Sequence, residues 1–416
     1  MKTGLNMGKK LALTSLIALQ IAAPLSAGVA AEEAKRGPIK IHQMNPAVAS
    51  CLEDLNQNCA LTAAVKTVTE EQQAMERAKV LLAVAESMIT LGQKDRAKRV
   101  LDMAIEAAES TKLSIAMTVT LREAIPLFAR LGYFDVTGNL LSKVDNQGLK
   151  DDLVMQVLRE KAAQDLTYAE MMTWAKLISS PEKAFWATLK VMEEEGINLS
   201  AIALNDLGLQ VEKQTTFAKK FRARASYAAI LWKNGERQKA QTLFDKLDAD
   251  FVLINAPSAK AQLASSKLAA MFNAGVDNGA LTTMLDFTKK QAVSINDPDE
   301  KARFAERVGP VEIKLGRVGS AVIRSVYFQD LMTQVEYVEK LAELTGKPAD
   351  EISQRIDYLA NQLSTIEDSY ERDVYRYRLL RSALSIKDKG LVKQLIQSME
   401  DDDNQARGLA LLAAIL

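Results

Sequence analysis

The chain has 416 residues, of which 48% are hydrophobic and 25% are charged, a balance typical of a folded globular protein rather than a disordered one. Lysine plus arginine and aspartate plus glutamate each total 53, so the net charge is zero. This balance argues against a nucleic-acid-binding protein, which needs a basic excess to neutralise phosphates.

The N-terminus has the pattern of a cleavable export signal. Three lysines lie within residues 2–10, an apolar run follows over 11–23, and small residues extend to Ala31. This order is typical of a Sec signal peptide, and we predict cleavage after Ala31, with Ala27 and Ala30 as alternatives. The other interpretation is a membrane anchor, for which the apolar run is short. The pattern favours a mature protein of the bacterial periplasm that has no transmembrane span.

The two cysteines, Cys51 and Cys59, follow a predicted flexible lead-in over residues 32–45. We expect them to form a disulfide, because an exported protein folds in an oxidising compartment. Along an uninterrupted helix their spacing would separate them by about 12 Å, which is too far for a bond. The disulfide therefore requires a helix break at residues 56–58, Asn-Gln-Asn, where asparagine is a good breaker and cap. The alternative is two buried free thiols.

A recurring glycine predicts a series of helical hairpins over residues 46–330. Six glycines are separated by 40, 64, 39, 40 and 41 residues, at Gly92, Gly132, Gly196, Gly235, Gly275 and Gly316. The long interval divides evenly at Gln164. The fifth residue after each of these seven positions is an alanine in six cases, at Ala97, Ala169, Ala201, Ala240, Ala280 and Ala321. In the remaining case it is a threonine, Thr137.

Each such unit is interpreted as a helix, a tight turn and a second helix. The glycine ends the first helix in the left-handed conformation, which costs glycine little. The alanine begins the buried face of the second helix, because a small side chain lets two helices approach closely. Hairpins of this length cannot bury their apolar faces alone, so they are expected to stack into a solenoid.

The repeated positions resemble the tetratricopeptide-repeat family over roughly residues 68–330. The resemblance is carried by two groups of residues: Leu91, Gly92, Ala97, Leu101 and Ala104, and then Gly235, Ala240, Phe244 and Leu247. It implies an all-α fold, a right-handed α-solenoid of stacked helical hairpins. It also implies a non-catalytic scaffold that binds a protein or peptide on its concave surface.

After Gly316 the spacing changes, and residues 331–416 are predicted to form a divergent helical C-terminal region or cap. One long helix is expected over residues 318–344. The segment 370–381, YERDVYRYRLLR, combines tyrosine with arginine, which are enriched in binding hot spots. Its partner-binding candidates are Arg372, Tyr375, Arg376, Tyr377 and Arg378. The alternative is an amphipathic helix whose arginines pair with local acids such as Glu371 and Asp373.

Groups for catalysis are scarce. The only histidine, His42, lies in the predicted lead-in, so no histidine-based nucleophile or metal site is expected in the solenoid. The acidic runs at 193–195 and 401–403 are interpreted as solvated helix ends. We therefore predict no catalytic residues, no metal and no cofactor.

Three functions are compatible with these features. The preferred one is a periplasmic interaction scaffold with a partner in the cell envelope. The second is a self-associating structural component, a homo-oligomer, which would need an exposed apolar end such as residues 409–416. The third is an all-helical polysaccharide-processing enzyme, which would need a deep cleft lined by tyrosines and carboxylates.

Overall fold

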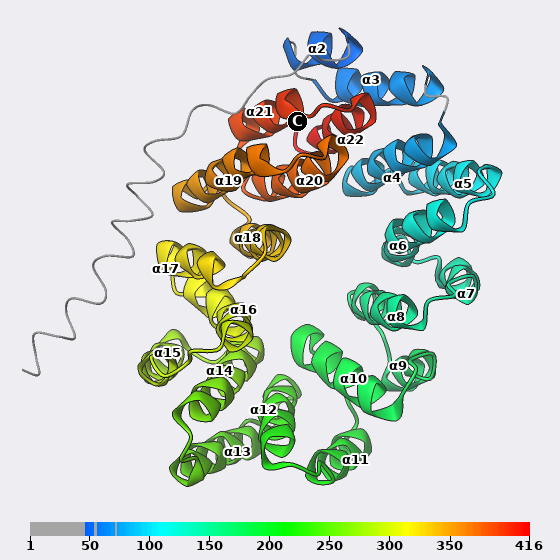
Figure 1. Cartoon of the computed structure of the whole chain (residues 1–416). Helices are drawn as coiled ribbons and strands as arrows, with labels where there is room; N and C mark the ends of the chain where they lie inside the picture. Colours follow the sequence, from blue (N-terminus) through cyan, green and yellow to red (C-terminus); the bar gives the residue numbers. More distant parts are fainter. Residues whose placement is uncertain (1–45, 54–55, 71–72) are drawn as a thin grey trace, which may run out of the picture.

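Every regular element in the described part of the chain is a helix. The computed structural model describes residues 46–53, 56–70 and 73–416, and no strand occurs in these ranges (Figure 1). The predicted all-α class is confirmed. The predicted signal peptide, the predicted lead-in and His42 lie outside the described residues.

The helices form two concentric layers (Figure 1). The inner layer consists of α4 (Ala74–Thr90), α6 (Ser114–Arg130), α8 (Gln147–Ala162), α10 (Pro181–Glu195), α12 (Phe217–Lys233), α14 (Pro257–Ala274), α16 (Pro298–Lys314), α18 (Leu331–Thr345), α20 (Ser369–Ser385) and α22 (Asp402–Leu412). The outer layer consists of α5 (Lys94–Ser110), α7 (Phe134–Ser142), α9 (Tyr168–Ala175), α11 (Ala201–Glu212), α13 (Arg237–Asp250), α15 (Asn278–Ala292), α17 (Val318–Ile323), α19 (Asp350–Gln362) and α21 (Lys389–Ser398). Short 3₁₀ turns follow three outer helices: η1 (Phe251–Leu253), η2 (Arg324–Tyr327) and η3 (Leu363–Thr365).

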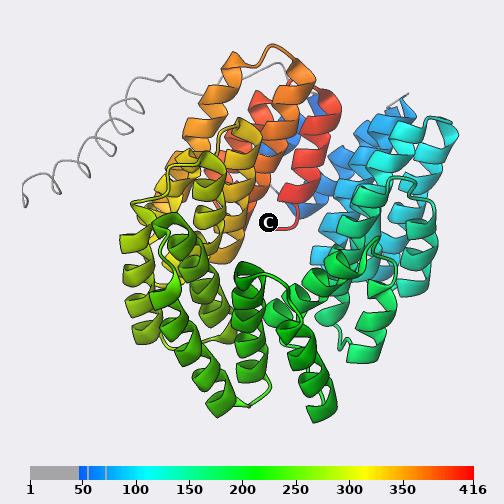
Figure 2. The same ribbon diagram turned by 60° about the horizontal axis from the view of Figure 1, so that its bottom comes forward.

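The inner layer closes into a ring. Each inner helix contacts the next one, and α22 contacts both α20 and α4 (Figure 1). Figure 2 shows that the helices run roughly along the axis of the ring. Residues 331–416, which were expected to form a divergent region or cap, continue the same alternation of inner and outer helices and complete the circle.

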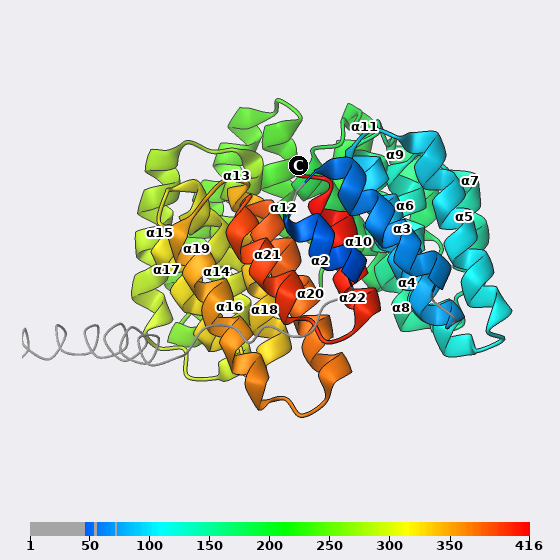
Figure 3. The same cartoon turned by 90° about the horizontal axis from the view of Figure 1, so that it is seen from above.

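The N-terminal helices complete the last hairpin. α2 (Pro46–Glu53) and α3 (Gln57–Glu70) both contact α22, so they occupy the place that an outer helix takes elsewhere (Figure 3). Gln57 Nε2 donates to the carbonyl oxygen of Ala413 (3.3 Å), and Ser87 Oγ donates to that of Ala410 (2.5 Å). The two ends of the described chain therefore hold the ring closed together.

The repeated glycines lie at the ends of inner helices. All six have φ between 72° and 88°, the left-handed region that favours glycine. At the end of α4, for example, the N–H groups of Gly92 and Gln93 donate to the carbonyl oxygens of Ile89 and Met88 (2.9 and 2.8 Å). These bonds satisfy carbonyl groups that a helix end leaves free.

The repeated alanines do not all have the predicted packing role. Ala97, Ala240 and Ala321 are fully buried, and Ala280 is half-buried. Ala169 and Ala201 are exposed, which corrects the prediction for both. Four residues separate Gly196 from α11, so Ala201 is the first residue of the helix rather than one turn inside it.

The long helix expected over residues 318–344 is also wrong. α17 ends at Ile323, the chain passes through η2, and α18 begins at Leu331. Asp330 caps the new helix, because its Oδ1 accepts from the backbone N–H of Thr333 at 2.8 Å. The break lets α17 stay in the outer layer while α18 returns to the inner layer.

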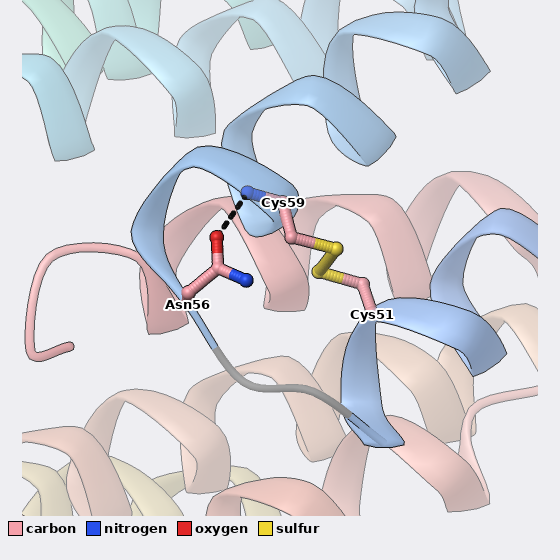
Figure 4. Close-up of a disulfide and its surroundings, with 3 residues drawn as sticks. All are labelled: Cys51, Asn56 and Cys59. Atoms are coloured by element: carbon pink, nitrogen blue, oxygen red, sulfur yellow. Dashed lines mark hydrogen bonds between the residues drawn. A yellow bond between two sulfur atoms is a disulfide. The ribbon is translucent and has the colours of Figure 1, made fainter.

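Cys51 and Cys59 form the predicted disulfide, with their Cα atoms 5.6 Å apart (Figure 4). The helix breaks between Glu53, the last residue of α2, and Gln57, the first residue of α3, so of the predicted break at residues 56–58 only Asn56 lies outside the helices. The Oδ1 atom of Asn56 accepts from the backbone N–H of Cys59 at 2.9 Å and so caps the start of α3 (Figure 4). The disulfide joins the two helices that cover α22.

Replacing both Cys51 and Cys59 with serine should lower the free energy of unfolding by about 2–3 kcal/mol, because the disulfide restricts the unfolded chain. Urea unfolding of the oxidised parent and of the double variant measures the difference. A reducing agent should bring the parent down to the stability of the variant and leave the variant unchanged. Equal stability of parent and variant would show that α2 and α3 unfold separately from the ring.

None of the described helices is long and apolar enough to cross a membrane.

Candidate binding surfaces

An apolar hollow of about 630 Å³, here called the aromatic groove, lies between the outer helices α13 and α15, with α14 behind it. Its apolar lining comes from α12 through α15 and includes Trp232, Phe244, Phe251, Met271, Met284 and Phe287. Neighbouring phenylalanine rings touch in a row: the centroids of Phe221 and Phe251 are 5.3 Å apart, and those of Phe251 and Phe287 are 5.2 Å apart. Two successive hairpins thus share one aromatic surface.

The polar groups of the aromatic groove are few. Lys267 forms an ion pair with Asp248, and Asp277 caps α15 by accepting from two backbone N–H groups. Burial lowers the pKa of Lys267, and Asp248 acts against this shift. Lys260 also lines the groove and has no partner within the described ranges. An apolar hollow with a few placed polar groups is the usual form of a binding site.

The edge of the groove presents apolar side chains to solvent. Val252 and Leu253, in η1, are 79% and 71% exposed, and Val252 lines the groove. No sequence pattern marks this surface, because its phenylalanines are spread over residues 221–287 and look like ordinary core residues. The sequence FVL at residues 251–253 is a partial indication of this surface, because a hairpin usually ends in a polar turn.

A second hollow of about 720 Å³, here called the polar cleft, lies between α16 and α18. It is lined by aromatic residues and by charges of both signs: Tyr327, Phe328, Tyr337, Asp299, Glu306, Asp330, Glu336, Arg303 and Lys340. Tyrosines and carboxylates in one cleft are what a polysaccharide-processing enzyme requires.

Two polar groups of the polar cleft are already used to hold the fold. Tyr337 donates from its hydroxyl to the carbonyl oxygen of Ala321 (3.1 Å), and burial raises its pKa. Asp330 accepts from the backbone N–H and the hydroxyl of Thr333, which lower its pKa. Asp330 therefore stays ionised near neutral pH and cannot act as a general acid there.

The predicted partner-binding residues lie on the inner helix α20, and most of their surface is covered by the chain itself. Tyr375, Arg376 and Tyr377 are buried, with 9%, 7% and 8% of their surface exposed. Arg372 and Arg378 are half-buried. This leaves little of the five side chains for a partner.

The arginines of α20 join neighbouring helices through ion pairs. Arg372 pairs with Glu400 (2.8 Å), which precedes α22, and Arg378 pairs with Glu339 (3.1 Å) on α18. Arg376 pairs within α20 with Asp373 (2.7 Å), which was the alternative interpretation of this segment. An inner helix has neighbours on three sides, so a polar face that looks free in the sequence meets other helices in the ring.

The described residues contain no group of three or more histidine, cysteine, aspartate or glutamate side chains that could hold a metal ion. Both cysteines are in the disulfide.

No protein-family model matches this chain, and no curated protein matches it.

Proposed function

We propose that this chain is an exported, non-catalytic interaction scaffold of the bacterial periplasm, which holds an amphipathic helix of a partner protein in the aromatic groove. The observation that carries the proposal is the shared aromatic surface of two successive hairpins, with Val252 and Leu253 exposed at its edge. The disulfide between Cys51 and Cys59 supports an oxidising compartment. Stacked helical hairpins of the tetratricopeptide-like kind suit this role.

The shape and charge of the groove favour a helix as the occupant. The groove runs between two helices of similar length, α13 and α15, so a third helix can lie between them and insert apolar side chains one turn apart. Asp248 and Asp277 are engaged, whereas Lys260 is free to pair with an acidic side chain of the partner. The concave inner wall, which the sequence favoured as the binding surface, carries many ion pairs between neighbouring helices, including Arg159–Glu194 and Arg381–Glu339.

Val252→Asp should abolish partner binding without unfolding the chain, because Val252 lines the groove and is mostly exposed. The matched control is Val293→Asp, which places the same charge on a side chain that is 87% exposed and lies outside the groove. The measurement is affinity capture of the mature chain from its own periplasm after mild crosslinking, read by mass spectrometry. We expect one or two proteins near stoichiometry with the parent and with Val293→Asp, and at least a tenfold loss with Val252→Asp.

The crosslinks distinguish the alternatives. Lysine crosslinks from Lys260 should map to an amphipathic helix of the captured protein. Recovery of the bait's own copies alone would favour the self-associating structural component instead. Equal capture by Val252→Asp and Val293→Asp would reject the groove as the binding surface.

The polar cleft supports a second candidate, the processing of a polysaccharide, because tyrosines and carboxylates line it together. Incubation of the purified chain with periplasmic glycans should then release fragments, and Glu306→Gln should abolish their release. If the parent releases fragments and Glu306→Gln releases them equally well, the polar cleft is not the site of this activity.

A further inference from the structure

Three arginines lie on the inner helices α12 and α16, both of which contact α14. Arg222 lies on α12, and Arg303 and Arg307 lie one turn apart on the same face of α16. The guanidinium of Arg307 reaches across to α14, where Nη1 donates to Gln262 Oε1 (2.9 Å) and Ser265 Oγ (3.3 Å). Arg222 is close enough to Arg307 for its charge to act on the pKa of Arg307.

This cluster lacks the carboxylate partners that several other arginines of the ring have. Elsewhere in the ring Arg159 pairs with Glu194 (2.8 Å), and Arg324 pairs with Glu312 (2.7 Å). Neither the side chain of Arg222 nor that of Arg303 has a hydrogen bond or an ion pair within the described ranges. The Nε atom of Arg222 is buried without any hydrogen-bond partner. An unpaired buried donor of a charged group costs stability in the free protein.

The nearby carboxylates form no ion pair with the three arginines in the part of the chain that the structure describes. Glu193, on α10, is buried and its Oε1 accepts from Asn273 Nδ2 at 2.7 Å. Burial raises the pKa of Glu193, which disfavours its charged form. Glu306 lies beside Arg307 in the chain and is exposed. Burial, and after it the charge of Arg222, lowers the pKa of Arg307 to about 10, and the charge of Glu306 acts against this shift.

We propose that Arg222, Arg303 and Arg307 bind a phosphate group. The planar guanidinium offers parallel N–H donors that match the oxygens of phosphate, and a doubly charged anion would supply the charge that this cluster lacks. Arg303 also lines the polar cleft of about 720 Å³, so the organic part of a phosphate ester has room beside the cluster. This site is separate from the aromatic groove and does not depend on the proposed scaffold function.

The experiment is calorimetric titration of the full mature chain with inorganic pyrophosphate, combined with thermal unfolding. The parent should bind pyrophosphate saturably, and Arg303→Gln should weaken the binding at least tenfold. Arg222→Met should raise the unfolding temperature without ligand, because it removes the unpaired donor, and should lose the rise that pyrophosphate causes in the parent. The matched control is Arg99→Gln, which makes the same charge change at an exposed arginine of the outer helix α5.

Each outcome decides the proposal. Loss of binding in Arg222→Met and Arg303→Gln with retention in Arg99→Gln supports it. Absence of saturable binding by the parent, or an equal loss in Arg99→Gln, overturns it. Parallel titrations with glucose 1-phosphate and with inorganic phosphate identify the source of the phosphate. Tighter binding of glucose 1-phosphate indicates an ester whose organic part lies in the polar cleft, and equal or weaker binding indicates the free anion.

Discussion

Replacing Leu409 with aspartate should open the ring and lower the free energy of unfolding by several kcal/mol. Leu409 is fully buried in α22, the helix that contacts α20 on one side and α3 and α4 on the other. Truncating a buried leucine to alanine costs about 2–5 kcal/mol, and a carboxylate at the same place adds the cost of burying an unpaired charge. The expected loss of stability therefore comes mainly from the contacts of α22, the helix that closes the ring.

Small-angle X-ray scattering and urea unfolding together test this expectation. Leu409→Asp should increase the radius of gyration and lower the urea midpoint, and Leu409→Ala should give a smaller change in the midpoint. The control is Leu209→Asp, because Leu209 is 56% exposed on α11, and it should change neither quantity appreciably. An unchanged radius of gyration together with an unchanged midpoint for Leu409→Asp would show that α22 does not close the ring.

Arg324→Met should destabilise the chain by about 3–5 kcal/mol, because it leaves the buried charge of Glu312 without its main partner. Glu312 is fully buried on α16, and Arg324 meets both of its carboxylate oxygens, at 2.7 and 2.9 Å. Lys289 on α15 pairs with the same carboxylate at 2.7 Å and remains after the substitution. The three residues join α15, α16 and η2.

The double variant Glu312→Met with Arg324→Met should recover most of the lost stability, since both charges are then removed from the interior. The control is Lys143→Met, which breaks the half-exposed pair of Lys143 and Glu109 and should cost less than about 1 kcal/mol. Urea unfolding of all four proteins at pH 7 gives the comparison. If Arg324→Met is no less stable than the double variant, an unpaired carboxylate at Glu312 does not have the expected cost.

Lowering the pH should remove the stability that the ionised Glu312 contributes to the parent protein. Burial alone would raise the pKa of Glu312, but the hydrogen bonds and charge of Arg324, helped by Lys289, outweigh it, so the pKa lies below its usual range. A lowered pKa in the folded state contributes stability above the unfolded pKa of about 4.3, and this contribution is lost as the pH falls through the folded pKa. In Arg324→Met the pKa of Glu312 should rise, so the gap in stability between parent and variant should narrow from pH 7 to pH 4.

The predictions that held are those that depend on neighbouring residues in the chain. Helical periodicity predicted the all-α class. The glycine spacing marked the ends of six inner helices, because the left-handed turn after a helix is decided by the residue that occupies it. Asn56 between Cys51 and Cys59 indicated the helix break that brings the two cysteines together.

The exposure of the predicted site residues depends on the place of each residue in the ring. Ala201 has the same offset from its glycine as Ala97, yet a longer connection leaves it exposed at the start of α11. Tyr375, Arg376 and Tyr377 have the composition of a binding surface, yet packing against neighbouring helices covers them. The burial of a side chain is decided by which helices surround it.

The sequence by itself determined that this protein is built of helices, where six of the inner helices end, and which cysteines are paired, since those properties follow from local propensity and spacing. Only the tertiary structure decided that the helices form a closed ring. The contacts that close it join residues as distant as Gln57 and Ala413, and no local pattern specifies such pairs. The tertiary structure also decided the aromatic groove and the arginine cluster. Each is made of side chains from successive hairpins, which are far apart in the chain and close together in space.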